Sequence, residues 1–375
     1  MNIILIPHLP KFSTRGYQLA KHLTNKGNIH FIMWDMPFPL TVNNIWYNII
    51  NSWKYTLSTK DRVTIHKIKR LPFFFPIINK WWFKKQINEI YNKYDIQFIL
   101  SESYFNETEP PLDLPIVYDL VDDHEAFIEI YGSPIYKWGC KILEVKKTIK
   151  NQILVSKKTL AVSDLLIDYV KKFNKVAIKI PNGVSDFFLN YSTRNVYKKH
   201  SLVYVSNFDK FSNLNNVVYA INSLATKYND INLNIVGDGS EIADAKNLVR
   251  TLKLEKYINF TGWINHNDVP EIINTSEVSL LPFKKDRLTD SSFPIKILEY
   301  LSVGNKIVSV DLSEVKLLKS SNIYTYSDDE KYKNLTKAID LAFKSKLQSD
   351  VNRRTATKYS WDKICDKLQL ITNDK

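Results

Sequence analysis

The chain has 375 residues and a mass of 43.8 kDa, more than one hydrophobic core usually serves, so we expect two domains. Hydrophobic residues make up 44% and charged residues 24%, a balance that excludes a disordered chain. The 52 basic and 39 acidic residues leave a net charge of +13. Such an excess favours anionic partners such as nucleic acid, acidic lipid or phosphorylated small molecules, with a solvated basic surface of no specific role as the alternative.

Membrane-spanning, secreted and zinc-scaffold proteins are not expected. No apolar run reaches the roughly 18 residues that a spanning helix needs, and the opening residues MNIILIP lack the charged lead of a signal peptide. The two cysteines, Cys140 and Cys365, lie far apart and outside metal-ligand spacing. We therefore expect a cytoplasmic protein without structural disulfides.

The first half of the chain alternates predicted strands and helices. Apolar runs predict strands and helical periodicity predicts helices, in this order: a strand over 2–7, a helix over 14–23, a strand over 29–34, strands over 96–100, 115–120 and 158–163, and a helix over 164–173. Strand, helix, strand is the typical opening of a doubly wound α/β domain.

Residues 184–200 lack periodicity and are rich in Asp, Asn, Ser, Thr and Lys, so we predict a linker there. The alternation then restarts, with strands predicted over 201–205, 232–236, 257–261, 277–281 and 306–310, and helices over 214–228, up to 252, over 269–274, over 294–302 and over 361–372. We therefore predict two Rossmann-like doubly wound α/β domains, over residues 1–185 and 186–356, and a separate C-terminal segment over 357–375.

Four segments of the second half carry the strongest motifs. They are LNIVGDGS (233–240), INFTGWI (258–264), VSLLPF (278–283) and SSFPIKILEYLSVGNKIV (291–308). In order and spacing they resemble the nucleotide-sugar-binding domain of GT-B fold glycosyltransferases. The similarity is to glycosyltransferase family 4, in particular its surface-polysaccharide branch with a Pro-x-Lys-x-x-Glu-Tyr-Leu motif. The resemblance covers roughly residues 155–370 and implies that the C-terminal helix crosses back to the first domain.

The resemblance implies a nucleotide-diphosphate sugar as donor, with no cofactor and no metal. Pro294 suits the first turn of a helix, with Ser291 or Ser292 as a cap before it, and a helix N-terminus attracts a diphosphate. Lys296 and Glu299 share one helical face. By resemblance Glu299 accepts hydrogen bonds from the donor's ribose and Lys296 lies near the diphosphate. The alternative is a plain salt bridge between these two side chains on the helix surface.

Further donor-binding candidates follow the predicted strands of the second domain. They are Asn207, Lys210, Gly239, Gly262, Trp263 and Ile264. Lys210 is the candidate for a second diphosphate cation, with a solvated loop lysine as the alternative. Where many family members have an additional glutamate, this chain has Ser291 with Asp290 beside it, so the donor sugar is not specified.

The candidate catalytic residues surround the end of the predicted strand 115–120. They are Asp119, Asp122, Asp123 and His124. Three aspartates in one place are costly to ionise together, so we expect one of them to have a raised pKa suited to proton transfer. Helix capping by Asp122 or Asp123 is the alternative, and it is compatible with catalysis. By resemblance Asp122 is the catalytic candidate and His124 a contact for the donor sugar or a structural histidine, while inversion and retention both remain open.

Residues 67–85 interleave six aromatic residues with lysines and an arginine. This pattern predicts a segment on an anionic membrane surface, with rings at headgroup depth and cations on phosphates. A buried core segment is the alternative.

We therefore expect a glycosyltransferase that moves a hexose from a nucleotide sugar to a lipid-linked or cell-surface glycan, as a peripheral protein on the inner face of the cell membrane. The alternatives are a nucleotide-sugar 2-epimerase of the same fold and a non-catalytic sugar-binding protein. Nucleic acid is not an expected partner, because the cations do not follow the repeated groove-facing pattern of nucleic-acid binders.

Overall fold

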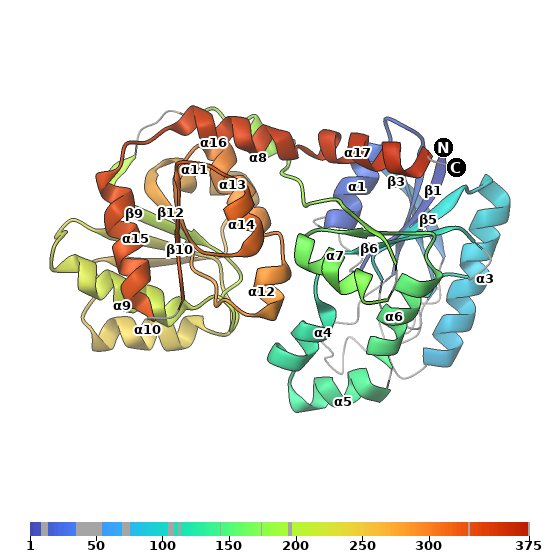
Figure 1. The fold of residues 1–375 in the computed structure, drawn as a ribbon, viewed down its shortest axis with the longest axis horizontal. Coiled ribbons are helices and arrows are strands. Elements are labelled where there is room, and N and C mark those ends of the chain that lie inside the picture. The colour runs from blue at the N-terminus through green and yellow to red at the C-terminus, as the bar shows by residue number, and fades with distance from the viewer. Residues whose placement is uncertain are drawn as a thin grey trace. The chain divides into compact units, whose positions relative to one another are not determined.

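A computed structural model describes residues 1–8, 14–34, 55–69, 76–103, 109–111, 114–142, 144–173, 175–193, 197–328 and 331–373. The chain divides into two compact units, one of Met1–Pro181 with Ile364–Lys375 and the other of Asn182–Lys363. Each unit is built on one parallel or nearly parallel sheet with helices around it (Figure 1), which confirms two Rossmann-like α/β domains. Within the described residues, no helix is both long enough and apolar enough to cross a bilayer.

The sheet of the first unit has eight strands in the order β3-β4-β2-β1-β5-β6-β7-β8, all parallel except β3, which is antiparallel to β4. The strands are β1 (Asn2–Ile6), β2 (Asn28–Met33), β3 (Thr56–Lys60), β4 (Val63–Lys67), β5 (Phe98–Ser101), β6 (Ile116–Leu120), β7 (Lys158–Ala161) and β8 (Ala177–Lys179). The helices are α1 (Arg15–Leu23), α3 (Pro76–Tyr94), α4 (His124–Ala126), the π-helix η2 (Phe127–Tyr131), α5 (Pro134–Ile142), α6 (Val145–Val155) and α7 (Asp164–Lys171), with α17 (Trp361–Asn373) at the C-terminal end.

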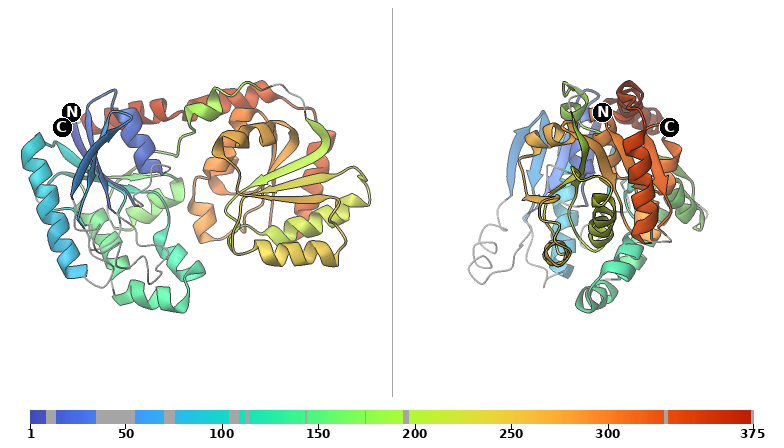
Figure 2. Two further views of the ribbon diagram at one scale, coloured as in Figure 1. Left: turned by 180° about the vertical axis from the view of Figure 1, so that it is seen from behind. Right: turned by 90° about the vertical axis from the view of Figure 1, so that its left-hand side faces the viewer.

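The sheet of the second unit has six parallel strands in the order β11-β10-β9-β12-β13-β14 (Figure 2). The strands are β9 (Lys198–Val205), β10 (Asn232–Val236), β11 (Ile258–Gly262), β12 (Ser276–Leu281), β13 (Lys306–Val310) and β14 (Ile323–Tyr326). The helices are α8 (Asp186–Leu189), α9 (Leu214–Ala225), α10 (Ile242–Thr251), η3 (His266–Asp268), α11 (Val269–Asn274), α12 (Arg287–Ser291), α13 (Ile295–Val303), α14 (Ser313–Leu317), α15 (Tyr332–Lys344), α16 (Ser349–Ala356) and η4 (Thr357–Tyr359).

Strand order fixes where each unit can bind a ligand. β1 lies between β2 and β5 in the first sheet, and β9 lies between β10 and β12 in the second. The winding of the chain therefore reverses between β1 and β5 and between β9 and β12. At such a reversal the loops that leave the carboxyl ends of the two strands diverge, and this is where doubly wound sheets bind their ligands. We call the side of each sheet at which its parallel strands end the carboxyl edge.

The predicted linker over residues 184–200 is only partly irregular. The short helix α8 lies within it, and β9 begins at Lys198 rather than at residue 201. Phe188 of α8 is fully buried, so this helix forms by packing rather than by an extended periodic pattern. The hairpin of β3 and β4 was also not predicted, because all five side chains of β3 are exposed and give no apolar signal.

The basic and aromatic segment 67–85 divides between core and surface. Phe83 is 2% exposed and lies in a hydrophobic cluster with Ile87 and Ile90, whereas Trp81 is 59% and Ile77 84% exposed. Residues 70–75 lie outside the described residues. The aromatic residues of this segment therefore do not form one exposed surface, and a membrane role remains a prediction for the N-terminal end of α3 alone.

Two substitutions at nearby positions of α3 test this division. We expect Phe83→Ala to destabilise the protein by ~3–5 kcal/mol, because it leaves a cavity in the core. Trp81→Ala, at an exposed position of the same helix, should change the free energy of unfolding by no more than ~0.5 kcal/mol. Urea denaturation of both variants provides the measurement. Equal losses would show that Trp81 is also part of the core.

Candidate functional site

The predicted donor-binding residues of the second unit lie on the loops at the carboxyl edge of its sheet. Asn207 and Lys210 follow β9, Gly239 follows β10, Trp263 and Ile264 follow Gly262 at the end of β11, and Ser291, Ser292 and Pro294 follow β12. The loops after β9 and β12 border the reversal of the sheet. The sequence therefore located residues at the position where this class of sheet binds its ligand.

The first turn of α13 has no capping side chain among the described residues. Pro294 is its N-cap, one position earlier than predicted, and contributes no side-chain hydrogen bond. The prediction that Ser291 or Ser292 caps this helix is wrong. Both serines end the unpredicted helix α12, and their hydroxyls donate to the carbonyl oxygens of Leu288 and Thr289, at 3.0 and 2.7 Å. The Ile297 N–H donates to the Pro294 carbonyl oxygen at 3.3 Å, so within the described residues the N–H groups of Ile295 and Lys296 are left to bind an anion, which the helix dipole also favours.

Lys296 and Glu299 form a salt bridge on α13. Lys296 Nζ lies 2.7 Å from Glu299 Oε2 in the i,i+3 arrangement. Glu299 is buried and Lys296 is half-buried, so the pair is less solvated than an ordinary surface pair. The plain salt bridge considered from the sequence therefore exists here. It also holds a carboxylate and a cation one turn from the uncapped helix end, where both can contact a ligand.

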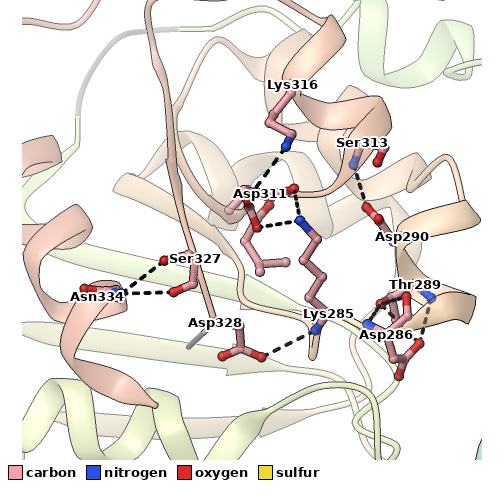
Figure 3. A network of polar contacts seen from close by, with 12 residues as sticks. Lys285, Asp286, Thr289, Asp290, Asp311, Ser313, Lys316, Ser327, Asp328 and Asn334 are labelled. Atoms are coloured by element: carbon pink, nitrogen blue, oxygen red, sulfur yellow. Dashed lines mark hydrogen bonds and ion pairs between the residues drawn. The ribbon is translucent and has the colours of Figure 1, made fainter. Parts of the chain in front are cut away.

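A polar network fixes the loop that leads from β12 to α13 (Figure 3). Lys285 Nζ donates to the carbonyl oxygen and to Oδ1 of Asp311, both at 2.9 Å, and the Lys285 N–H donates to Asp328 Oδ2 at 3.4 Å. Asp286 accepts from the backbone N–H groups of Leu288 and Thr289 and so begins α12 with a capping box. The loop is therefore bound to the ends of β13 and β14, which restricts the position of the α13 N-terminus.

Asp290 belongs to this network rather than to an open site. Its Oδ1 accepts from the Ser313 N–H at 2.7 Å, at the start of α14 (Figure 3). Ser291 beside it is buried. The acid adjacent to the position of the missing glutamate thus already has a structural partner.

The glycines after β10 allow two loops to pack together. A Cβ atom on Gly237 would lie 2.0 Å from the Ser206 carbonyl oxygen, and one on Gly239 would lie 2.5 Å from the Phe208 backbone. Gly237 also has a φ of +127°, which a side chain rarely permits. Gly239, predicted as a donor contact, therefore positions the loop that carries Asn207 and Lys210.

Three side chains at this edge extend into solvent. Asn207 and Lys210 are exposed, and the Trp263 indole is 69% exposed directly after β11. Gly262 before it has a φ of +67°, a left-handed conformation that turns the chain out of the strand. The Trp263 ring is therefore accessible to a ligand.

In the first unit, Arg15 holds Asp119 and the end of β8. Arg15 binds the Asp119 carboxylate through Nε at 2.8 Å and through a terminal nitrogen at 3.2 Å, and it donates to the carbonyl oxygens of Ile180 and Pro181. Asp119 is fully buried within β6. A carboxylate in a bidentate pair of this kind has a positioning role, so Asp119 is the least suitable of the three aspartates as a base.

The remaining predicted catalytic residues have different roles. Asp123 accepts from the Ala126 N–H at 2.9 Å and caps α4, as the alternative interpretation proposed. Burial raises the pKa of Asp122 to about 7, with the Asp123 charge adding to the rise and Arg15 opposing it. Burial, and then the neighbouring His8, lower the pKa of His124 well below its ordinary value. Asp122 therefore exchanges a proton near neutral pH, and His124 is neutral there.

Glu102 and His8 complete this cluster, and the sequence analysis missed both. Glu102 follows β5 directly, and one of its oxygens accepts from the His8 N–H at 3.3 Å, while the other has no hydrogen-bond partner among the described residues. Burial and the Asp119 charge raise the pKa of Glu102 to about 8, with Arg15 opposing them. The His8 and His124 rings lie 4.9 Å apart, and burial lowers the pKa of His8 to about 4.

The ends of β1, β5 and β6 therefore bring four carboxyl groups and two neutral imidazoles together at the reversal of the first sheet. The signal that could have found Glu102 is its position. Like Asp122, it is an acid placed directly after a buried strand. In the described parts of the chain, no group of three or more His, Cys, Asp or Glu side chains could hold a metal ion.

Comparisons with known proteins show similarity to glycosyltransferases. Residues 192–358 match the family model "Glycosyl transferases group 1". The chain is 29% identical over 154 residues to an uncharacterized glycosyltransferase of Haemophilus influenzae, a match that spans 40% of this chain and 42% of that protein. It is 23% identical over 297 residues to the N-acetyl-alpha-D-glucosaminyl L-malate synthase of Bacillus anthracis, spanning 77% and 72%.

Solved structures share the whole fold at low identity. HepE of Anabaena, solved with UDP and with UDP-glucose, aligns over all of both chains with a TM-score of 0.69 and 12% or 11% identity. WaaG, a glycosyltransferase involved in lipopolysaccharide biosynthesis, aligns equally completely with a TM-score of 0.69 and 12% identity. The fold is therefore GT-B, and the matches together support a glycosyltransferase whose second unit carries a group 1 domain.

The raised pKa of Glu102 predicts a pH-dependent stability difference. Between about pH 4.5 and pH 8 the native protein keeps a proton on Glu102 that the unfolded chain releases, so the native state loses stability as the pH rises. We expect the stability of Glu102→Gln relative to wild type to increase across this range and to level off above it. Urea denaturation at a series of pH values measures it.

Glu89→Gln, at an exposed glutamate of α3, is the matched control. Its difference from wild type should stay constant with pH, because an exposed carboxylate remains solvated on folding. Parallel curves for Glu102→Gln and Glu89→Gln would contradict this account of Glu102.

Proposed function

We propose that the protein transfers a hexose from a nucleoside diphosphate sugar to a glycan hydroxyl, with the donor held by the second unit. The observation that carries this proposal is the uncapped first turn of α13 next to the Lys296–Glu299 pair. It combines an anion site, a half-buried cation and a buried carboxylate within one turn of helix. These are the groups that a diphosphate and a ribose diol require.

Each part of the donor has a suitable counterpart. Departure of the nucleoside diphosphate builds negative charge on its phosphates, which the α13 N–H groups and Lys296 stabilise. Glu299 accepts hydrogen bonds from the ribose hydroxyls. Trp263 offers an exposed ring to the nucleobase, and Lys210 a second cation to the diphosphate. The HepE complexes with UDP and UDP-glucose support a uridine nucleotide.

The first unit supplies the acceptor side of the reaction. Asp122, whose pKa lies near 7, takes the proton from the attacking hydroxyl, and the neutral His8 and His124 hydrogen-bond sugar hydroxyls. When Asp122 removes this proton behind the bond that breaks, the sugar's configuration inverts. No metal is assigned a role, because helix N–H groups and lysines provide the charge that stabilises the diphosphate.

The acceptor that we propose is a lipid-linked or cell-surface glycan, and the protein is proposed to act as a peripheral enzyme at the inner face of the membrane. The role of WaaG in lipopolysaccharide biosynthesis supports this class of acceptor. The net charge of +13 supports work next to an anionic surface.

Two substitutions on α13 separate the ribose contact from the phosphate contact. Glu299→Ala should weaken both UDP and uridine by tens of fold, because losing a charge-assisted hydrogen-bond pair costs ~1.5–3 kcal/mol. Lys296→Met should weaken UDP and leave uridine unchanged. Calorimetry measures UDP binding and ligand-observed NMR measures uridine binding.

Glu255→Ala, at an exposed glutamate of the same unit, provides the control and should leave both affinities unchanged. If Glu299→Ala binds UDP as tightly as wild type does, the carboxylate does not contact the donor, and the proposed donor site is wrong.

Asp122→Asn tests the base. The amide keeps the shape of the side chain but cannot take a proton, so turnover should fall ~10²–10⁴-fold while UDP affinity stays within about twofold. Transfer from the radiolabelled donor to an acceptor extract, together with calorimetry, provides both values. Asp123→Asn, at the α4 cap, is the matched comparison, and greater damage there than at Asp122 would assign the base to Asp123.

A further inference from the structure

Helix α5 of the first unit presents large apolar side chains to solvent. Ile135 is 81% exposed, Trp138 67% and Ile142 58%. They are spaced three and four residues apart, so they share one face of the helix, which we call the α5 face. The opposite side of α5 packs on the protein, where Cys140 is buried and the Tyr136 ring meets Phe127 edge-on. A helix on a water-facing surface does not ordinarily bury its small side chains and expose its large apolar ones.

A lysine flank accompanies the α5 face. Lys137 and Lys141 are four residues apart, both exposed, and lie between the apolar side and the protein-facing side of the helix. In the described part of the chain, neither ammonium group has an acidic partner. The two glutamates nearby are paired instead with Lys146 and Lys147.

A cavity of about 480 Å³ opens beside this flank. It is lined by Ile128, Glu129, Lys137, Cys140, Lys141, Glu144, Val145, Lys146 and Lys147. The lining is mainly apolar, and its lysines outnumber its glutamates four to two, so the lining residues carry a net positive charge. Such a cavity can hold a phosphate group beside its lysines.

The α5 face lies close to the candidate acceptor site along the chain. α5 begins after α4 and η2, which follow Asp122 directly. Figures 1 and 2 place α5 and the N-terminal end of α3 at the same end of the first unit, on the side of the carboxyl edge of its sheet. The exposed Ile77 and Trp81 of α3 therefore lie at that end as well.

We propose that the α5 face and its lysine flank dock the protein on an anionic lipid bilayer, with a headgroup phosphate beside the lysines that line the cavity. The isoleucines and the tryptophan enter the bilayer to the depth of the headgroups and first methylenes, and Lys137 and Lys141 contact phosphates. This inference rests on the proposed function for its purpose, which is to bring a lipid-linked acceptor to Asp122. It does not require donor binding or catalysis.

Charge favours a bilayer over a second copy of the chain as the occupant. In a two-fold contact of the α5 face with itself, the lysine flanks would face one another and repel. An anionic surface pairs with both lysines at once, and its interior accepts the three apolar side chains. The shape and charge of the surface thus complement the membrane.

Vesicle flotation of the full chain tests the proposal, with phosphatidylglycerol/phosphatidylcholine vesicles as the probe. The triple variant Ile135→Ser, Trp138→Ser, Ile142→Ser should bind more than about 100-fold more weakly than wild type, because three apolar contacts are lost. Lys137→Gln with Lys141→Gln should bind roughly 20- to 30-fold more weakly at low salt and show a smaller salt dependence. All five positions are exposed, so circular dichroism should show an unchanged melting temperature.

The matched control is Val176→Ser, Leu317→Ser, Leu341→Ser, which removes three similarly exposed apolar side chains elsewhere. It should bind vesicles as wild type does. The proposal is overturned if wild type does not float with anionic vesicles or if the α5 triple variant floats equally well. It is also overturned if light scattering shows a dimer that this variant dissociates, since the face would then be a subunit interface. Calorimetry with UDP is independent of these outcomes and tests the proposed function separately.

Discussion

The uncapped first turn of α13 is the feature on which the donor site depends. A helix end at the carboxyl edge of a sheet normally satisfies its N–H groups with Ser, Thr, Asp or Asn side chains. Here two serines are available in the sequence directly before the helix, and both are bonded within α12 instead. Among the described residues, the N–H groups of Ile295 and Lys296 are thus kept for an anion, which the helix dipole favours.

Keeping a helix end open has a structural requirement, since no side chain caps that end and other contacts must fix the helix. The loop network around Lys285, Asp286 and Asp290 fulfils it. At the other side of the helix, the buried Tyr300 hydroxyl accepts from the Val205 N–H at 3.0 Å and so holds α13 against β9. The position of the anion site is therefore fixed by charged and polar contacts that do not themselves reach the ligand.

In the first unit, the main constraint is the burial of carboxyl groups away from water. Several carboxyl groups converge at the ends of β5 and β6, and only one cation, Arg15, reaches them from the described part of α1. Arg15 binds both carboxylate oxygens of Asp119, whereas burial raises the pKa of Glu102 and of Asp122 with Arg15 opposing the rise. One neutralised acid next to one acid that titrates near neutrality is an arrangement suited to proton transfer. α5, a short distance along the chain, would bring an acceptor in a bilayer to this cluster.

Sequence reasoning predicted the fold class and most strands because buried parallel strands are continuous apolar runs. β10, α11 and β13 were predicted to the residue. It missed β3, whose side chains are all exposed, and α12, whose five residues carry no periodicity. Because α12 was missed, Ser291 and Ser292 were wrongly predicted to cap α13. In the site, motif spacing located Lys296 and Glu299, and strand ends located Asp122. The sequence did not show which side chains form ion pairs, because those contacts join residues far apart in the chain. That Arg15 would occupy Asp119 rather than Asp122 depends on contacts across more than a hundred residues.

Hydrogen exchange of the α13 backbone tests the central claim most directly. With a saturating nucleoside diphosphate, the amides of Ile295 and Lys296 should exchange more slowly, because a bound phosphate accepts from them. The account predicts protection at these two amides, with little change in the first turns of α9 and α15. Protection at another helix end, with Ile295 and Lys296 unchanged, would contradict it.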